Sequence, residues 1–363
     1  MNVVHRPAPS TPLRVGIIGL GRVASRLEDD PLRAKPCTHA GSYSVHPATR
    51  IVAGADVDAE AREAFRGRWG VERIYEDYRE MLEVERLDIV SVCAYASDRA
   101  VMVIDAVESG ARGIWCEKAI ATSLDEARRM TESCRDRGVV TVVNYSRRWS
   151  PVYREAKRRI ARGDIGEPQA IVSCFSGHLI HTGTHAFDVM RMLFGEVTRA
   201  SGTLDASGED LLGAHGHAEV DPTAEELGDL GGDATLVFAN GAVGTVHARA
   251  KRYYAFSFEV IGREGAIRLG NETPARIYRP GPSRSCAGFT VLGPRPLRTR
   301  EARPVAPQVD DLVRGILHDA APASTLDDGT RALEIALAIH VSARDGAPVD
   351  LPIADPSFRV ASR

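Results

Sequence analysis

The sequence of 363 residues lacks several features that mark particular classes of protein. No uninterrupted apolar stretch approaches the roughly 18 residues that a membrane span needs. Long runs of Lys or Arg are also missing, and 46 basic against 49 acidic residues give a net charge of -3, which argues against nucleic-acid or membrane-surface binding. The N-terminal segment has no apolar core of a signal peptide, so we expect residues 1–12 to form a disordered arm and the protein to be cytoplasmic.

Paired cysteines are missing as well. The six cysteines are scattered along the chain, and no two of them form a C-x-x-C pair. Three of them, Cys93, Cys116 and Cys174, lie in apolar runs typical of strands. We therefore expect reduced, mostly buried thiols and no zinc site built on cysteine.

Apolar and charged residues occur in the proportions of an ordinary globular protein, 44% and 26%, and the length predicts about two domains. From residue 13 to residue 144, short apolar runs alternate with helical patterns, which predicts an α/β domain with a doubly wound, mostly parallel sheet. From residue 233 on, apolar runs flank turn signals such as Asn240-Gly241. The remainder, residues 145–363, is therefore expected to be an α+β domain with a large, mainly antiparallel open sheet.

A glycine-rich turn directly follows the first predicted strand, residues 13–18. The sequence from Gly19 to Ala24 has the spacing G-x-G-x-x-A. Gly19 permits a tight turn, and Gly21 lets the backbone approach a pyrophosphate. The N–H groups at the start of the next helix, at Arg22 and Val23, then face the phosphates. This pattern predicts a dinucleotide-binding turn.

An acidic residue, Asp56, ends the second predicted strand. A carboxylate at this place can accept both ribose hydroxyls of an adenosine and repels a 2′-phosphate, which favours NAD over NADP. Asp56 follows Gly19 by 37 residues, whereas the usual interval is about 20. We interpret residues 27–39 as an insertion between the first helix and the second strand. Alternatively, Asp56 only caps the helix predicted over residues 59–66.

No Lys or Arg occurs between Arg199 and Arg249. Within this part, residues 205–232 are rich in glycine and in acidic residues, which indicates a surface loop. The loop is either a solvated excursion of the chain or a lid or partner contact.

Several motifs occur in an order that resembles the glucose–fructose oxidoreductase / inositol dehydrogenase / MocA (Gfo/Idh/MocA) family over about residues 13–353. Besides the glycine turn they are Glu117-Lys118-Ala119, the junction at residues 144–149, Gly-Thr-His-Ala-Phe-Asp at 183–188 and the hairpin at 238–242. The resemblance implies an NAD-binding Rossmann domain over 13–144 and a substrate-binding and oligomerisation domain over 145–363. It also implies hydride exchange at a secondary alcohol of a sugar, cyclitol or glycoside, and a homodimer or homotetramer formed through the C-terminal sheet.

The chain departs from the family pattern at three positions. Ala119 stands where the family has a proline after the lysine. Arg99 stands where the family has the histidine of a Pro-x-x-x-His motif, which implies a changed loop under the nicotinamide. His181 stands where the family often has an aspartate, four residues before its motif histidine, so the proton-transfer group is open.

The resemblance assigns catalysis to Lys118 and His185, and His181, at the position that departs from the family pattern, is a further catalytic candidate. An ammonium beside the reacting oxygen stabilises an alkoxide, and the pKa of an imidazole suits proton transfer near neutral pH. If one helix covers this stretch, His181, His185 and Asp188 share a face, and Asp188 either orients an imidazole or packs near the helix. The alternatives are a surface pair of Lys118 with Glu117, and a metal site formed by histidines 178, 181 and 185. We expect no metal.

Further site residues follow from the same resemblance. Glu117 and Lys118 are expected to contact the cofactor, and Lys118 also the substrate. Tyr145 and Arg148, at the expected domain junction, suit contacts with sugar hydroxyls, phosphates or carboxylates. Two other functions are open: a glycoside-cleaving enzyme that returns the hydride to the same NAD, and a dinucleotide-sensing regulatory protein.

Overall fold

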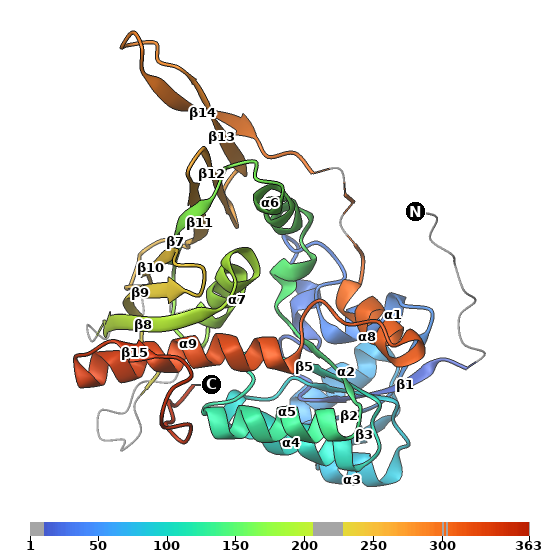
Figure 1. The fold of residues 1–363 in the computed structure, drawn as a ribbon. Helices are drawn as coiled ribbons and strands as arrows, with labels where there is room; N and C mark the ends of the chain where they lie inside the picture. Colours follow the sequence, from blue (N-terminus) through green and yellow to red (C-terminus); the bar gives the residue numbers. More distant parts are fainter. Residues whose placement is uncertain (1–10, 206–227, 300, 303, 363) are drawn as a thin grey trace. The chain divides into compact units, whose positions relative to one another are not determined.

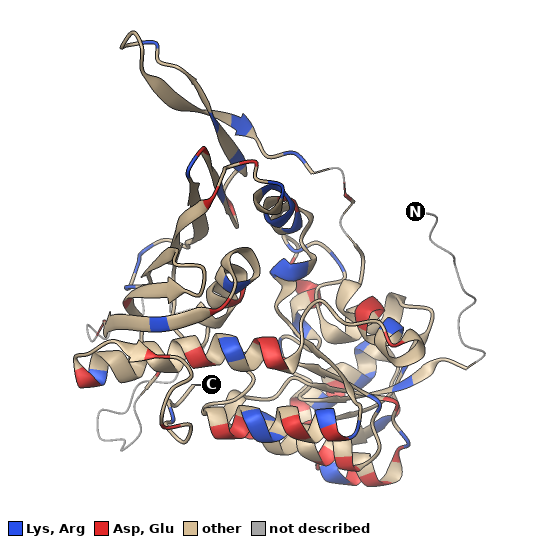
Figure 2. Ribbon diagram, viewed as in Figure 1, with Lys and Arg blue, Asp and Glu red and all other residues tan. Residues whose placement is uncertain are grey.

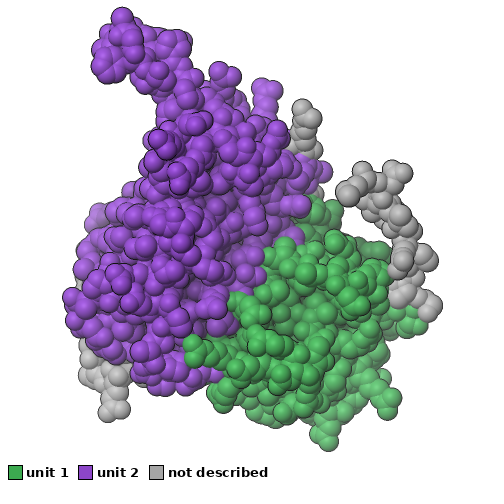
Figure 3. All heavy atoms as spheres, viewed as in Figure 1, with its two compact units in different colours: residues 1–121, 126–144, 304–327 green, residues 122–125, 145–303, 328–363 purple. Residues whose placement is uncertain are grey.

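A computed structural model describes residues 11–205, 228–299, 301–302 and 304–362. The first ten residues of the expected arm and most of the expected acidic loop, residues 206–227, lie outside this part. The chain forms two compact units, coloured in Figure 3. Unit 1 comprises residues 1–121, 126–144 and 304–327, and unit 2 comprises residues 122–125, 145–303 and 328–363.

Unit 1 is built on a six-stranded parallel sheet with the order β3-β2-β1-β4-β5-β6 (Figure 1). Its strands are β1 (Leu13–Ile18), β2 (Thr49–Ala55), β3 (Arg73–Tyr75), β4 (Ile89–Val92), β5 (Gly113–Cys116) and β6 (Val140–Val143). Its helices are α1 (His39–Val45), α2 (Ala59–Trp69), α3 (Tyr78–Val84), α4 (Ala96–Glu108), most of α5 (Leu124–Asp136) and α8 (Pro307–His318). The predicted doubly wound domain is therefore confirmed.

The central strands of unit 1 read as continuous apolar runs because both faces of the sheet are covered. Every residue of β4 and of β5 is buried, and Val15, Ile17 and Ile89 are fully inaccessible. In this order the connections leave β1 toward β2 on one side and reach β4 on the other, so the topological switch point lies between β1 and β4.

The first helix is interrupted, which corrects the predicted place of the insertion. After the glycine turn the chain makes one helical turn, in which the Ser25 N–H donates to the Gly21 carbonyl at 3.0 Å. A short 3-10 helix, η1 (Arg26–Asp29), and a loop follow before α1 begins. The insertion thus lies within the first helix and not between that helix and β2.

Hydrogen bonds join the two parts of this helix. The N–H groups of His39 and Ala40 donate to the carbonyls of Val23 and Ala24 at 3.2 and 3.0 Å. Glu28 closes the intervening loop, since its Oε1 accepts from the N–H groups of Cys37 and Thr38 and from the Thr38 hydroxyl.

Unit 2 is built on a nine-stranded sheet with the order β14-β13-β12-β11-β7-β10-β9-β8-β15. Its strands are β7 (Pro168–Phe175), β8 (Val197–Leu204), β9 (Gly232–Phe238), β10 (Val243–His247), β11 (Phe256–Gly262), β12 (Gly265–Gly270), β13 (Arg276–Pro282), β14 (Thr290–Pro296) and β15 (Val349–Asp350). Its helical elements are η2 (Ser146–Trp149), α6 (Pro151–Ala161), α7 (Gly183–Phe194) and most of α9 (Leu326–Asp345). Among the described strand pairs of this sheet, β10 with β7 is parallel and the others are antiparallel, so the expected mainly antiparallel open sheet is confirmed.

One face of the nine-stranded sheet is covered and the other is more exposed. Along β7, β9, β10 and β11, buried residues alternate with partly exposed ones. Helix α7 packs on β7, and Ile339 of α9 lies against Gly202 of β8. The Asn240-Gly241 turn joins β9 to β10 as predicted, with Gly241 at a φ of 84°.

Two features lie outside the sequence-based expectations. Helix α8 belongs to unit 1, where it packs on β5 and β6, so residues 304–327 differ from the expected continuous second domain. The β13–β14 hairpin extends the second sheet at its edge (Figure 1), and Figure 2 shows basic residues along it. No Asp or Glu occurs from residue 273 to residue 299.

Among the described residues, no helix is both long enough and apolar enough to cross a membrane. The cysteines are all free thiols, of which Cys116 and Cys134 are buried and Cys286 is exposed. Burial raises the pKa of the Cys116 thiol to about 12, so this sulfur stays protonated and packs as an apolar group.

Candidate active site

The glycine turn is fixed at the carboxyl end of β1 by both neighbouring strands. The Gly19 N–H donates to the Ala55 carbonyl, and the Cys93 N–H donates to the Ile18 carbonyl, both at 2.8 Å. Gly19 has a φ of 82°, and a Cβ there would lie 3.0 Å from the Ala94 nitrogen. Only glycine combines this conformation with this close approach of β4.

The second glycine of the turn faces open space. A Cβ on Gly21 would meet no atom within 4 Å, so packing within the protein does not require a glycine here. The missing side chain instead leaves the backbone open to a ligand. The helical turn that follows has the N–H groups of Gly21, Arg22 and Val23 at its start, where donors lack partners within a helix. Such donors suit the pyrophosphate of a dinucleotide, so the turn fits NAD.

Asp56 joins the end of β2 to the glycine turn. Its Oδ2 accepts from the Leu20 N–H at 2.6 Å, and its Oδ1 accepts from the Asp58 N–H at 2.9 Å. The cap of α2 is Asp58, whose side chain accepts from the Glu60 N–H, so the alternative that Asp56 caps this helix is wrong. The carboxylate oxygens of Asp56 keep further lone pairs with which to accept ribose hydroxyls.

The Glu117-Lys118 motif follows β5 at the same edge of the sheet. Glu117 is buried, and its Oε1 accepts from Asn144 Nδ2 at 2.6 Å and lies 3.0 Å from His39 Nε2. Its Oε2 accepts from the Lys118 N–H at 3.2 Å. Burial by itself raises the pKa of Glu117, but the hydrogen bond and charge of His39, together with the charges of Lys118 and Arg99, lower it to about 2. A buried carboxylate anion therefore contacts the main chain of the half-buried Lys118.

The partner of Glu117, His39, was not among the predicted site residues. Its imidazole stacks on Trp115 with ring centroids 3.6 Å apart, and its Nδ1 lies 3.1 Å from Ser91 Oγ. The Tyr43 hydroxyl lies 2.9 Å from the same Ser91 oxygen. The available signal was a serine in the otherwise apolar strand β4, since a polar group buried there needs partners.

Unit 2 contains the other predicted site residues: Tyr145 directly precedes η2, which contains Arg148, and His181 precedes α7, which contains His185. Helix α7 begins at Gly183, so His181 precedes it and does not share a helical face with His185 and Asp188, as the spacing had suggested. The His181 N–H donates to Asp229 Oδ2 at 2.8 Å. The half-buried imidazole of His185 lies edge-on to the ring of Tyr145, with centroids 5.6 Å apart. Burial raises the pKa of the Tyr145 hydroxyl, which therefore remains neutral.

Asp188 pairs with an arginine and not with an imidazole. Its carboxylate is fully buried and accepts from Arg148 Nε at 2.9 and 3.0 Å, and Arg148 Nη2 lies 2.7 Å from Asp188 Oδ1. Asp328 receives a further hydrogen bond from Arg148 at 2.8 Å. Burial raises the pKa of Asp188 to about 6 although Arg148 lies beside it. These ion pairs hold Arg148 in one orientation.

The structure brings the predicted residues together in two sets. Gly19, Gly21, Asp56, Glu117 and Lys118 all follow the carboxyl ends of parallel strands in unit 1. Tyr145 and His185 contact each other in unit 2, whereas His181 lies outside the helix that carries His185. Within the described residues, no group of three or more His, Cys, Asp or Glu side chains could hold a metal ion.

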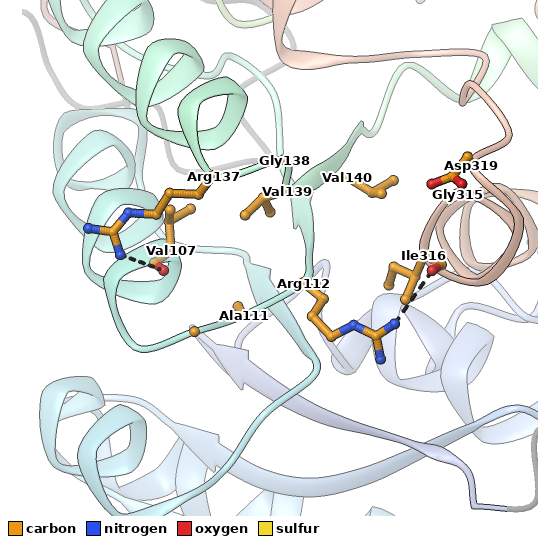
Figure 4. Close-up of a pocket in the computed structure, with 11 residues that line it drawn as sticks. Val107, Ala111, Arg112, Arg137, Gly138, Val139, Val140, Gly315, Ile316 and Asp319 are labelled. Atoms are coloured by element: carbon orange, nitrogen blue, oxygen red, sulfur yellow. Dashed lines mark hydrogen bonds between the residues drawn. The ribbon is translucent and has the colours of Figure 1, made fainter.

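A pocket of about 280 Å³ lies at the opposite edge of the unit 1 sheet (Figure 4). Its lining includes Arg112, Arg137, Val140, Ile316 and Asp319. The lining residues surround the amino ends of β5 and β6, whereas the glycine turn follows a carboxyl end. The pocket is therefore separate from the predicted cofactor residues.

Models of one known protein family match both parts of the chain. The family model GFO_IDH_MocA, described as an oxidoreductase family with an NAD-binding Rossmann fold, matches residues 13–145. The model GFO_IDH_MocA_C, described as the C-terminal alpha/beta domain of that oxidoreductase family, matches residues 175–351.

Individual relatives also match most of the chain. The chain is 28% identical to scyllo-inositol 2-dehydrogenase (NAD(+)) of Bacillus subtilis (strain 168), with 94% of this chain and 97% of that protein covered. It is 25% identical to myo-inositol 2-dehydrogenase of Thermotoga maritima, with 71% and 75% covered. The fold is similar to that of a levoglucosan dehydrogenase in complex with NADH, at a TM-score of 0.75, 21% identity and coverage of 94% and 100%. The chain therefore belongs to the Gfo/Idh/MocA family of oxidoreductases, and NAD is the cofactor of its Rossmann domain.

Proposed function

We propose that this protein is an NAD-dependent dehydrogenase or reductase that transfers a hydride between the nicotinamide and a secondary alcohol of a sugar, a cyclitol or a glycoside. The observation that carries the proposal is the position of Lys118, which follows β5 beside the buried Glu117 carboxylate in the sheet that also bears the glycine turn. The substrate class is supported by relatives named as dehydrogenases of scyllo-inositol, myo-inositol and levoglucosan.

The proposed chemistry divides between a proton acceptor and a stabiliser of negative charge. When bound, NAD supplies the hydride acceptor. Lys118 presents its ammonium to the substrate oxygen and stabilises the negative charge that develops as the proton leaves. His185 accepts that proton, and the edge of the Tyr145 ring keeps the imidazole in place. Tyr145 is 1% exposed, which suits it to orienting His185 better than to touching a substrate.

The other proposed site residues of unit 1 bind and orient the cofactor. Gly19, Gly21, Arg22 and Val23 provide backbone contacts for the pyrophosphate, and Asp56 accepts the adenosine ribose hydroxyls. The negative charge of the Glu117 carboxylate stabilises the positive charge of the neighbouring Lys118.

Two further residues of unit 2 are proposed as site residues. His181, whose main chain is anchored by Asp229, is a second proton-transfer group. Arg148 is a substrate contact whose orientation is set by its ion pairs.

The test is NADH formation, followed at 340 nm, with NAD and a panel of scyllo-inositol, myo-inositol, levoglucosan, free sugars and glucosides. We expect turnover of at least one alcohol and a loss of about 10²-fold or more in kcat for Lys118→Ala, with NADH affinity retained. Lys157→Ala, which removes an exposed lysine on α6, is the matched control and should leave kcat unchanged. Full activity of Lys118→Ala would refute the role of Lys118.

A silent panel, with NADH still bound tightly, would refute a dehydrogenase of these alcohols and favour the enzyme that recycles its NAD or the dinucleotide sensor. Cleavage of a glycoside with NAD present but without net NADH would then favour an enzyme that returns the hydride to the same NAD.

We further propose that the protein forms a homodimer or homotetramer through the more exposed face of the unit 2 sheet. That face carries Val172, Val237, Val243, Thr245 and Ile261 on adjacent strands, and Val243 and Ile261 are 40% and 36% exposed. An apolar sheet face of this kind suits an isologous contact between two copies. Val243→Glu should shift the mass measured by light scattering toward that of the monomer, whereas an unchanged mass would exclude this face.

A cytoplasmic location is also proposed. It is supported by the free thiols, which persist in reducing compartments, and by the dependence on NAD. Fractionation of the native host with antibodies against this chain tests it.

A further inference from the structure

An arginine is buried beside the Glu117-Lys118-Ala119 turn, where it contacts the main chain. Arg99 lies in the first turn of α4 and is 6% exposed. Its Nη1 donates to the carbonyl of Ala119, the residue that directly follows Lys118. A charged donor makes a hydrogen bond of about twice the strength of a neutral one. The contact therefore restrains the Ala119 carbonyl and the peptide plane to which it belongs.

The environment of Arg99 indicates that this contact has a purpose beyond packing. Among the described residues, Arg99 Nε is buried without a hydrogen-bond partner. Burying a guanidinium with an unsatisfied donor costs free energy, which an apolar residue at this place in α4 would avoid. A group retained at such a cost is expected to do something that an apolar side chain cannot do.

The turn around Lys118 is anchored on both sides. Before Lys118, the Glu117 carboxylate is held by Asn144 Nδ2, by His39 Nε2 and by the Lys118 N–H. After it, the Ala119 carbonyl is held by Arg99. The held carbonyl belongs to the peptide plane between Ala119 and Ile120, which is joined to the Lys118–Ala119 plane only through φ and ψ of Ala119. Fixing it therefore limits the directions in which the chain can continue after Lys118.

The residue after Lys118 cannot provide this restraint by itself. A proline, which the family pattern has at this position, fixes its own φ near −65° through its ring. Ala119 leaves φ free, so fixing its backbone has an entropic cost of about 1–2 kcal/mol per residue that some other contact must offset. The Arg99 contact acts on the same residue.

We propose that Arg99 is a positioning residue for Lys118: it holds the Ala119 carbonyl and thereby replaces the backbone restraint that proline supplies in the family pattern. The two departures from that pattern, at positions 99 and 119, are then one compensating pair. This inference rests on the proposed function, in which Lys118 acts on the substrate oxygen.

The experiment is a double-mutant comparison of wild type, Arg99→Gln, Ala119→Pro and the double variant. We expect Arg99→Gln to lower kcat about 10- to 100-fold, as a misplaced catalytic group does. Affinity for NADH, measured by its fluorescence, should change less than about twofold, because the glycine turn and Asp56 are untouched. Ala119→Pro should restore most of the lost kcat in the Arg99→Gln background and change little in the wild type. A role of Arg99 in packing alone would not be repaired at residue 119.

A readout independent of activity accompanies these kinetics. Hydrogen–deuterium exchange of the peptide spanning residues 117–123 should rise in Arg99→Gln and return toward the wild-type rate in the double variant. Arg50→Gln, an exposed arginine on β2, is the matched control and should alter neither kcat nor exchange. If Arg99→Gln does not fold, Arg99→Lys keeps the charge with a shorter reach, and an intermediate loss with partial rescue by Ala119→Pro is expected.

The outcomes separate the two proposals. Unchanged kcat and unchanged exchange in Arg99→Gln would overturn the positioning role. A loss of NADH affinity of more than about tenfold without rescue at residue 119 would also overturn it and make Arg99 a cofactor contact. If Lys118→Ala is fully active, the role of Lys118 fails by itself, and the exchange rates still show whether Arg99 restrains the turn.

Discussion

The buried pair of Glu117 and His39 makes a quantitative prediction about acid stability. The pKa of Glu117 is lowered from its usual 4.5 to about 2, and the carboxylate lies wholly inside unit 1. Because the folded-state pKa is depressed, the corresponding stabilisation is complete above pH 4.5 and is lost as the pH falls toward 2. At 1.36 kcal/mol per pKa unit, the ionised form of Glu117 contributes about 3 kcal/mol at neutral pH.

Glu117→Gln tests this magnitude, since it keeps the shape of the side chain and removes the charge. We expect the free energy of unfolding at pH 7 to fall by about 3 kcal/mol. Because wild type loses the same contribution in acid, the difference between the two proteins should shrink between pH 4.5 and pH 2. Urea unfolding at several pH values measures this difference in the free energy of unfolding. Tryptophan fluorescence is the signal, because Trp115 stacks on His39 and therefore lies beside the pair.

A matched control separates this effect from the general loss of a carboxylate. Glu63 is exposed on α2, where it pairs with Arg66 at 2.6 Å. Glu63→Gln should change the free energy of unfolding by less than about 0.5 kcal/mol. The reasoning is refuted if Glu117→Gln is as stable as wild type at pH 7, or if its deficit does not depend on pH.

Two further predictions concern the cofactor turn. Gly19→Ala places a Cβ 3.0 Å from the Ala94 nitrogen at a φ of 82°, so it should destabilise unit 1 by about 1–3 kcal/mol. It should also abolish NADH binding in a fluorescence titration, and retained affinity would show that the turn is not the cofactor site. Asp56→Ala should weaken NADH binding at least tenfold. Asp58→Ala should lower the free energy of unfolding by about 1 kcal/mol, because the α2 cap is lost, and should leave NADH affinity unchanged. Equal effects of the two variants on NADH binding would contradict the separate roles of these aspartates.

Local patterns in the sequence were sufficient for much of unit 1. The turn at Gly19 and Gly21 follows from glycine spacing directly after an apolar strand, and the parallel sheet follows from the alternation of strands and helices. The hairpin at Gly241 was equally predictable, since a two-residue turn selects its own residues. Each of these features is determined within a short window of sequence.

Contacts between distant residues were not predictable in this way. His39 meets Glu117 across 78 positions, and no periodicity links the two. Asp188 stands three residues after His185, which suggested a partner for the imidazole, but Arg148 offers a charged fork that competes better for a buried carboxylate. The helical pattern of α8 likewise does not reveal that this helix packs on β5 and β6 of unit 1.

The interruption of the first helix has a consequence for how chain length can vary in this protein. The bonds from His39 to Val23 and from Ala40 to Ala24 are those of an uninterrupted α-helix from which residues 27–38 have been looped out. A chain without these twelve residues would join Arg26 to His39 with the helical frame intact. It would also bring Asp56 to within 25 positions of Gly19, close to the interval of about 20 found in most dinucleotide-binding turns. The segment is thus a detachable module, and loops of other lengths and sequences can be grafted there while both the glycine turn and His39 keep their places.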